Sequence, residues 1–362
     1  MSIKELYIGV MSGTSLDGID VALCEINASS CKLLASAEYP FDARLKSEVL
    51  NVIARETTLR EIGVLDNKLG RLFADAVNAF IADNQIDKNG VKAIGLHGQT
   101  LWHEPDGERP FTTQLGDANV VAASTNVKTV ADFRRMDMAF GGQGAPFAPA
   151  FHQFLFSKLE GHVAVVNIGG MANITLLEES LKGWDSGCGN VMLDMWISKT
   201  RGKAYDKDGE FARSGAIDHD LLERMLDDDY FKKLPPKSTG RERFNETWLA
   251  KFLPIFNAIK DEDIQRTLLE LTARSIAWDL NQTQTTEAIV CGGGSKNVFL
   301  MKRLDELCEC DVVVSEKYGV ESDFLEAMAF AWLAYKRLHE EVVKLSSVTG
   351  AKKDSLLGGI YG

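Results

Sequence analysis

The fold is decided near the start of the chain by the stretch Leu6-Tyr7-Ile8-Gly9-Val10-Met11-Ser12-Gly13-Thr14-Ser15-Leu16-Asp17-Gly18-Ile19-Asp20-Val21-Ala22-Leu23. It opens with an apolar run that is typical of a buried strand. After the glycine-rich turn 11–18, apolar residues alternate with others at the period of two of a second strand. The stretch therefore predicts a strand, a glycine-rich turn and a second strand, paired as a hairpin.

The same pattern recurs in the middle of the chain. Val163–Ile168 is an apolar run, Gly169-Gly170-Met171-Ala172-Asn173 is a turn, and 174–177 resumes a strand. A third glycine turn, Gly292-Gly293-Gly294, follows the short apolar run 288–291. The repetition predicts two similar domains, each with one strand–turn–strand unit.

Helices lie among these strands. Apolar residues follow helical spacing over 60–85, and the stretch 324–339, rich in Ala, Leu, Met and Trp, is predicted as a second helix. Strands that alternate with helices are typical of an α/β protein. We expect a first domain over 1–133, a second over 134–339, and a C-terminal segment, about 340–362, that packs back on the first.

The composition excludes several classes of function. The chain has 362 residues and a net charge of −12, with 45% apolar and 25% charged residues. Its basic runs are short, so we expect no binding to nucleic acid or to an anionic membrane. We see no signal peptide and no apolar run long enough to span a membrane. The six cysteines form no Cys-x-x-Cys pair, so we expect a cytoplasmic protein with reduced thiols and no zinc site.

The glycine turns are candidates for binding phosphate, because successive backbone N–H groups in such turns form a nest for anions. In the first turn Thr14 and Ser15 add hydroxyl donors, and Asp17 and Asp20 add carboxylates that suit magnesium. It is neither a P-loop nor a Rossmann turn, since no Gly-Lys-Ser/Thr follows and the next element is a strand. A tight hairpin turn without a ligand is the alternative interpretation.

Three glycine turns that each close a strand resemble the actin-like ATPase and sugar kinase superfamily. That resemblance implies two ribonuclease H-like domains with a nucleotide cleft between them, the first two turns holding phosphates and the third the adenosine. The superfamily usually has an aspartate where this chain has Met11 and where it has Asn167. The general base must therefore come from elsewhere.

With these two aspartates replaced, the chain resembles one family, the 1,6-anhydro-N-acetylmuramic acid kinases. The motifs that carry the resemblance span nearly the whole chain: Met11–Gly18, Gly95–Thr100, Asp132–Arg134, Gly141–Pro146, Asn167–Asn173 and Leu357–Tyr361. The resemblance implies an ATP-dependent kinase that opens the anhydro ring with water and phosphorylates it to N-acetylmuramic acid 6-phosphate, in peptidoglycan recycling.

The resemblance also implies a catalytic base, Asp185, in the segment Trp184–Asn190. We expect this segment to form a turn. An anhydro sugar has no free primary hydroxyl, so a base must activate water to attack the anomeric carbon. The alternative is that Asp185 caps the helix that runs through Met192 and Trp196. Asp194, further along that helix, is interpreted as structural.

The remaining site residues follow from the same resemblance. The expected ATP-binding residues are Gly13, Thr14, Ser15, Leu16, Asp17, Gly18, Ile19, Asp20, Gly169, Gly170, Asn173, Gly187, Gly292, Gly293 and Gly294. The expected substrate-binding residues are His97, Arg134 and Glu326, where Arg134 would pair with the lactyl carboxylate. For these three the alternatives are a structural histidine, a surface ion pair and an acid at a helix N-terminus. Magnesium is expected at Asp17 and Asp20.

Two other functions stay open at this point. One is a kinase for another 1,6-anhydro sugar, and the other is a non-kinase actin-like ATPase that works as a conformational switch. The resemblance also implies a homodimer, for which the sequence itself shows no interface.

Overall fold

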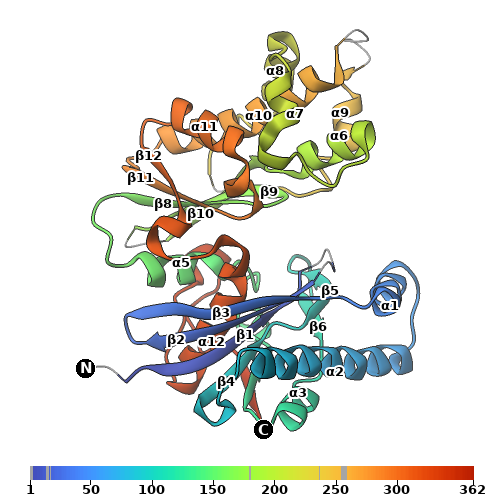
Figure 1. The fold of residues 1–362 in the computed structure, drawn as a ribbon, viewed down its shortest axis with the longest axis vertical. Coiled ribbons are helices and arrows are strands. Elements are labelled where there is room, and N and C mark those ends of the chain that lie inside the picture. The colour runs from blue at the N-terminus through green and yellow to red at the C-terminus, as the bar shows by residue number, and fades with distance from the viewer. Residues whose placement is uncertain (1–2, 14–15, 17, 179–180, 236, 254–258) are drawn as a thin grey trace. The chain divides into compact units, whose positions relative to one another are not determined.

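The computed structural model describes residues 3–13, 16, 18–178, 181–235, 237–253 and 259–362. The chain forms two compact α/β units. The first unit runs to Leu155 and resumes at Phe324, and the second is Phe156–Asp323 (Figure 1). Thr14, Ser15 and Asp17 of the first glycine turn lie outside the described residues.

The first unit is built on a six-stranded sheet with the order β13-β7-β4-β1-β2-β3. Its strands are β1 (Glu5–Met11), β2 (Gly18–Asn27), β3 (Ser30–Pro40), β4 (Val91–Leu96), β7 (Thr129–Ala131) and β13 (Gly359–Tyr361). β1, β2 and β3 pair antiparallel, whereas β4 pairs parallel with β1 and with β7. The predicted hairpin is confirmed, with Met11 opposite Asp20.

Helices cover both faces of this sheet. The helices of the unit are α1 (Ala43–Ala54), α2 (Leu59–Asp83), α3 (Ala118–Thr125), α4 (Arg135–Ala139), α5 (Ala148–Phe156), α12 (Leu325–Leu338) and α13 (Ser346–Thr349). Ile8 and Val10 of β1 share a core with Leu69 and Phe73 of α2. Gly9, between them in β1, faces α12 instead, because successive residues of a strand point to opposite faces.

The close approach of α12 requires glycine at two positions of the sheet. A β-carbon on Gly9 would lie 1.8 Å from the carbonyl oxygen of Ala327, and one on Gly95 of β4 would lie 2.0 Å from that of Phe330. Both obstacles are backbone atoms of a helix, which cannot move aside as a side chain does. Glycine in a strand interior commonly marks such a contact.

Replacing Gly95 with alanine is therefore expected to destabilise the first unit by about 3 kcal/mol, at the upper end of the usual cost of overpacking. Urea unfolding followed by circular dichroism would measure it. Gly63→Ala in α2 is the matched control, since a β-carbon there meets nothing within 4 Å. Because alanine favours a helix over glycine, this control should gain about 0.5–1 kcal/mol. An unchanged unfolding midpoint for Gly95→Ala would contradict the close packing.

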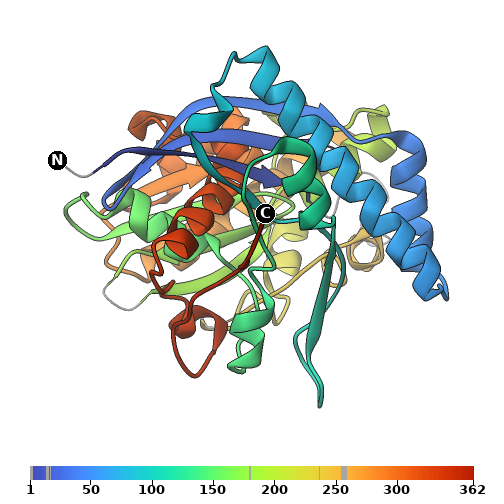
Figure 2. The ribbon, with the colours of Figure 1, turned by 90° about the horizontal axis from the view of Figure 1, so that it is seen from below.

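A two-stranded hairpin stands apart from the main sheet of the first unit. It pairs β5 (Gln99–Glu104) with β6 (Phe111–Leu115), and Figure 2 shows it as a separate ribbon below α2. Gln99 at its base accepts a hydrogen bond from Ser12 Oγ (2.7 Å) and donates one to the carbonyl of Gly13 (3.3 Å). The Gly-x-His-Gly-Gln motif thus supports the first glycine turn.

The second unit repeats the architecture with a five-stranded sheet in the order β10-β9-β8-β11-β12. Its strands are β8 (Val163–Ile168), β9 (Met171–Leu176), β10 (Lys182–Cys188), β11 (Glu287–Cys291) and β12 (Asp311–Val314). β8, β9 and β10 pair antiparallel, and β11 pairs parallel with β8 and β12. These directions match those of β1, β2, β3, β4 and β7, so the predicted pair of similar α/β domains is confirmed.

The helices of the second unit enclose a large apolar core. They are α6 (Val191–Arg201), α7 (Glu210–Ser214), α8 (His219–Leu226), α9 (Glu246–Ala250), α10 (Asp261–Asn281) and α11 (Val298–Leu307). The long helix α10 is central, and its Leu268, Leu269 and Leu271 are fully buried.

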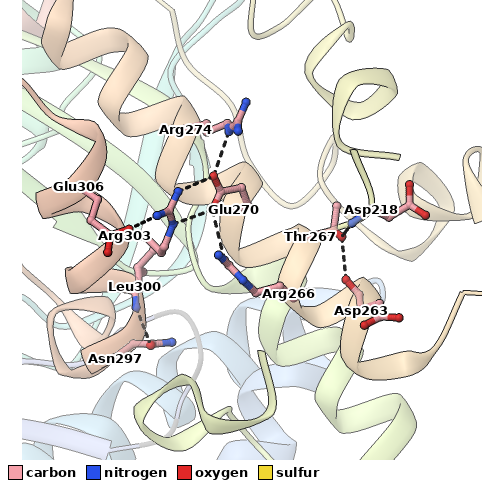
Figure 3. A network of polar contacts seen from close by, with 10 residues as sticks. All are labelled: Asp218, Asp263, Arg266, Thr267, Glu270, Arg274, Asn297, Leu300, Arg303 and Glu306. Atoms are coloured by element: carbon pink, nitrogen blue, oxygen red, sulfur yellow. Dashed lines mark hydrogen bonds and ion pairs between the residues drawn. The ribbon is translucent and has the colours of Figure 1, made fainter. Parts of the chain in front are cut away.

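A charged network joins α10 to α11 inside this unit (Figure 3). The carboxylate of Glu270 is fully buried and accepts hydrogen bonds from three arginines. Arg303 of α11 donates two bonds of 2.9 Å, and Arg274 and Arg266 donate bonds of 3.0 and 3.2 Å. One buried anion therefore holds together three cations from two helices.

The borders of the units differ from those predicted at 133/134 and 339/340. The segment after 133 stays with the first unit because Phe151 and Phe154 of α5 stack against Trp332 of α12. Helix α12 in turn fills the sheet face that Gly9 leaves open. Tertiary packing of this kind leaves no mark in the linear pattern. Separately, none of the described helices is long and apolar enough to cross a membrane.

Candidate active site

The site of the second unit is organised by a row of residues across its sheet. In the antiparallel register Asp185 of β10 lies opposite Asn173 of β9, which lies opposite Asn167 of β8. Directly paired residues have their side chains on the same face of a sheet. Strands are spaced by about 4.8 Å, so Asp185 stands roughly 10 Å from Asn167 on that face. The chain thus carries a carboxylate two strands away from the asparagine that replaces the superfamily aspartate.

The two carboxylate oxygens of Asp185 differ in their contacts. Oδ2 accepts hydrogen bonds from Ser238 Oγ and from the backbone N–H of Thr239, both at 2.9 Å. Oδ1 accepts none from the described residues. Burial raises the pKa of Asp185 above its ordinary value, the two hydrogen bonds oppose the rise, and the charge of Glu242 adds to it. Such a half-buried carboxylate with one free oxygen is suited to accept a proton.

The structure corrects the local setting of Asp185. The residue lies in strand β10, on a register irregularity between Asp185 and Gly187, and not on a turn. It does not cap the following helix either, since α6 begins after Asn190, whose side chain makes no capping bond. Pairing with β9 decides this conformation, and the alternative interpretation as a helix cap is wrong.

The second glycine turn packs against the end of the same segment. The backbone N–H groups of Gly189 and Asn190 donate to the carbonyls of Gly170 and Gly169 at 2.9 and 2.8 Å. A β-carbon on Gly189 would lie 2.4 Å from the carbonyl oxygen of Gly169, so only glycine fits there. Gly187 is buried, and Phe231 occupies the space of its missing side chain, so packing already explains this glycine.

The third glycine turn closes on β8. Gly292 has a φ of +78°, and a β-carbon on it would lie 2.4 Å from Oδ1 of Asn167. Beside this turn is a cavity of about 540 Å³. It is lined by Asn190, Leu193, Asp194, Tyr205, Asp206, Lys207, Asp208, Gly293, Lys296 and Asn297. Of the three expected nucleotide-binding glycines in this turn, Gly293 lines the cavity. Gly292 and Gly294 pack against β8 instead.

Two charged residues near this cavity, Asp194 and Arg241, were not predicted as site residues. Burial raises the pKa of Asp194 to about 6, with Arg241 lowering it and Asp206 raising it. Asp194, which the sequence led us to interpret as structural, lines the cavity. The guanidinium of Arg241 lies beside the second glycine turn, 3.6 Å from where a side chain on Gly170 would begin. No pattern in the sequence marks this contact of Arg241, because it joins segments that are distant in the chain.

In the first unit, the described part of the glycine turn presents its backbone. The side chains of Leu16 and Ile19 are buried in the core, so these two residues can contact a ligand only through the main chain. Leu16 has a φ of +55° and donates its N–H to the carbonyl of Gly13 at 3.2 Å. Asp20 is half-buried on β2, beside Met11.

The structure brings His97 and Arg134 together in the same unit. Arg134 donates to Nε2 of His97 from Nε (3.3 Å) and from Nη2 (2.8 Å). Burial, followed by the positive charge of Arg134, lowers the pKa of His97 to about 3, so the ring is neutral and accepts these bonds. The histidine therefore acts as a fixed support for the arginine.

Two further contacts hold the guanidinium of Arg134 in place. Nη1 donates to the carbonyl of Gly144 at 2.8 Å, and the guanidinium lies 5.0 Å from the ring centre of Phe147. Among the described residues, partners are found for three of its five N–H groups, and one N–H on Nη1 and one on Nη2 remain as a fork for a carboxylate. Burial lowers the pKa of Arg134 to about 10, and attraction to Glu326 on the first turn of α12 opposes this.

Each unit thus gathers part of the expected site. The second unit brings Asp185, Asn173 and the turns at 169 and 292 to one region of its sheet. The first unit gathers His97, Arg134 and Glu326. Among the described residues no group of three or more histidines, cysteines or acids is placed to hold a metal. Magnesium needs fewer, because it often takes one or two carboxylates together with substrate phosphates and water.

The two units share a strand order, to which the first unit adds β13, and each has a glycine turn after its first strand. This arrangement defines an α/β protein of the actin-like class. A family model described as anhydro-N-acetylmuramic acid kinase matches residues 5–362. The chain belongs to that family, which confirms the resemblance seen in its motifs.

Relatives of the same name cover the whole chain. One from Sulfurimonas denitrificans is 57% identical over 366 residues, which cover 99% of this chain and 100% of that protein. One from Pasteurella multocida is 48% identical and covers 98% of this chain and 96% of that protein. One from Vibrio vulnificus is 48% identical, and the match covers 100% of this chain and 99% of that protein. Each is named anhydro-N-acetylmuramic acid kinase.

Proposed function

We propose that this chain is an ATP-dependent kinase that hydrolytically opens 1,6-anhydro-N-acetylmuramic acid and forms N-acetylmuramic acid 6-phosphate, in peptidoglycan recycling in the cytoplasm. Membership of the family supports the reaction. The observation that carries the mechanism is the placement of Asp185 in the row that contains Asn167, with one carboxylate oxygen to which no described residue donates.

In this reaction Asp185 accepts a proton from a water molecule while the water oxygen attacks the anomeric carbon. The bond from that carbon to the bridging oxygen breaks, and the bridging oxygen attacks the γ-phosphate of ATP. A new bond to phosphorus forms as the bond to the β-phosphate breaks, so ADP leaves. Asp185 then releases its proton to solvent. One base serves both bond changes because ring opening itself generates the nucleophile.

For the nucleotide we propose the glycine turns and the cavity beside Gly293. Backbone N–H groups at Gly13 and Gly170 suit phosphates, whereas the N–H of Gly169 already donates to the carbonyl of Met171 at 3.1 Å. The cavity suits the adenosine. The guanidinium of Arg241 adds a positive charge beside Gly170. Magnesium, held by Asp20 and by Asp17, would offset phosphate charge as it does in other kinases.

For the sugar we propose His97, Arg134 and Glu326. The free fork of Arg134 matches the lactyl carboxylate, and Glu326 can accept from a sugar hydroxyl. An anhydroglucose has no carboxylate, so the fork favours a muramic sugar over the alternative of another anhydro sugar. A homodimer remains a proposal from the family, to be tested by sedimentation equilibrium.

Arg134→Met is expected to raise the KM for the muramic sugar by about 10–100-fold, the value of one hydrogen-bonded charge pair. Turnover of 1,6-anhydroglucose, if measurable, should not fall in the variant. Coupled ADP release at varied sugar concentration measures both. Arg135→Met is the control, because Arg135 is exposed and pairs with Asp132 instead. An unchanged KM for the muramic sugar would remove Arg134 from the site.

The function itself is tested by ADP release from the wild-type protein with and without 1,6-anhydro-N-acetylmuramic acid. The proposal expects release that depends on the sugar and a phosphorylated product of matching mass. Slow release that ignores the sugar would instead favour an ATPase that works as a conformational switch.

A further inference from the structure

A short loop of the second unit, residues 237–239, wraps the carboxylate of Asp185. Ser238 Oγ and the backbone N–H of Thr239 donate to the same oxygen, Oδ2, at 2.9 Å each. The backbone of Asp185 is held as well. Its N–H donates to the carbonyl of Lys237 at 3.0 Å, and its carbonyl accepts from Tyr230 Oη at 2.7 Å. Main chain and side chain of Asp185 are therefore both attached to this part of the unit.

The loop is anchored by a buried ion pair. Lys237 Nζ lies 3.0 Å from Oδ1 of Asp279 in α10, and the side chains are only 2% and 5% exposed. The other oxygen of Asp279 accepts from Nε1 of Trp184 at 2.8 Å. Since Trp184 directly precedes Asp185 in β10, one carboxylate holds both the loop and the strand that carry the contacts of Asp185.

Such a pair is a poor way to gain stability. Removing two charges from water is unfavourable, and apolar residues of similar volume often stabilise a protein as well or better. What an ion pair with directed hydrogen bonds adds is a defined geometry. Asp279 has one oxygen for Lys237 and one for Trp184, so a shift of the loop against the strand would leave a buried charge without its partner.

We propose that Lys237, Ser238, Thr239 and Asp279 position the base: they hold Oδ2 of Asp185 and leave Oδ1 as the oxygen that takes the proton from water. The inference rests on the proposed function of Asp185. It gives a role to the polar loop 237–239, which lies between α8 and α9. These are positioning residues, because they act on the reaction through Asp185.

The loop also affects the protonation of Asp185. Hydrogen bonds to a carboxylate favour its charged form, and both loop donors lower the pKa of Asp185 against the effect of burial. Loss of one donor should raise that pKa and widen the range of orientations open to the carboxylate. Both consequences can be measured separately.

Ser238→Ala is the first test. The acid limb of kcat/KM should move up by about one pH unit. Losing one hydrogen bond to the charged carboxylate should raise its pKa by about that amount. The maximal kcat should fall about tenfold, with the KM for ATP unchanged. Ser238→Thr keeps the hydroxyl and should restore both. Ser214→Ala, whose hydroxyl donates to the carbonyl of Phe211 instead, should match the wild type.

A direct titration separates this inference from the proposed function. Carbon-13 NMR of the Asp185 carboxyl, assigned with Asp185→Asn, reports its pKa without any turnover. A raised pKa in Ser238→Ala with a matching shift of the acid limb supports the inference. If neither moves, the inference is overturned. If the pKa moves but wild type shows no sugar-dependent turnover, the proposed function fails and the loop contacts stand.

The anchor is tested with the double variant Lys237→Met, Asp279→Asn, which removes both charges and keeps the volume, while the amide oxygen can still accept from Nε1 of Trp184. We expect a melting temperature close to that of the wild type with kcat about tenfold lower, because the loop loses its register. A double variant with wild-type kcat and pH profile would overturn the role of the ion pair. If this variant does not fold, the Ser238 variants still decide the proposal.

Discussion

Asp185→Asn is expected to lower sugar-dependent ADP release by about 10²–10⁴-fold, the range that a general base contributes. The amide has the same shape and still accepts the bonds of Ser238 and Thr239 through its oxygen, so the fold should be kept. It cannot take a proton from water. The KM for ATP should change little, since the nucleotide turns are not altered. Coupled ADP release under saturating sugar and ATP measures the loss.

Two further observations make this prediction specific. The pKa of Asp185 is raised above 3.8 by burial, so wild-type turnover should rise with pH through a value above 3.8 as the base loses its proton. In the Asn variant that acid limb should disappear from the residual rate. Asp227→Asn is the control, because that carboxylate is 77% exposed and pairs with Lys232 on the surface. Full turnover of Asp185→Asn would remove Asp185 as the base.

Glu270→Gln is expected to destabilise the second unit by about 3–5 kcal/mol, the usual loss when one member of a buried ion pair is removed. The side chain of Glu270 is fully buried, and glutamine would leave Arg266 and Arg274 without their counter-charge and Arg303 with Glu306 alone. Figure 3 shows all three arginines meeting at this one carboxylate, and among the described residues only Arg303 pairs with a second acid, Glu306. Urea unfolding at neutral pH would measure the change.

The pH dependence of this effect has a definite sign. Burial alone would raise the pKa of Glu270, but the bonds from Arg303 and Arg274 hold it below the ordinary 4.5. A carboxyl with a lowered pKa in the folded state contributes stability above 4.5 and loses it as pH falls through the lowered value. The difference between wild type and Glu270→Gln should therefore shrink below pH 4.5.

The matched control for Glu270 is Glu246→Gln. Glu246 is exposed and pairs with Lys199 on the surface, and such pairs contribute about 0–1 kcal/mol. If the two variants lose the same free energy of unfolding, the Glu270 network is no more than a surface-type interaction and the prediction is wrong.

Much of the fold could be predicted because the decisive signals are local. Apolar runs and a period of two predicted strands, and the observed β8 begins and ends where the sequence placed it. Apolar residues at helical spacing predicted α2, and a stretch rich in Ala, Leu, Met and Trp predicted α12, each within a few residues. Short-range patterns of this kind reflect burial on one face, which the sequence records directly.

The site was predictable in kind but not in its arrangement. Long motifs pointed to Asp185, Arg134 and His97, yet the strand that carries Asp185 was expected to be a turn. Its conformation depends on pairing with β9, and the contacts of Asp194 and Arg241 depend on segments distant in the chain. No spacing in the sequence records such neighbours.

The sequence by itself determined the α/β class, the two strand–turn–strand units and the family, because each rests on contiguous residues. Only the tertiary structure decided where the units divide, that Asp185 shares a row with Asn167, and that Lys237 and Asp279 hold the loop around it. These features arise from strand register and from packing between distant segments. The first glycine turn is read from the sequence, whereas the surroundings of the proposed base appear only when the strands are paired.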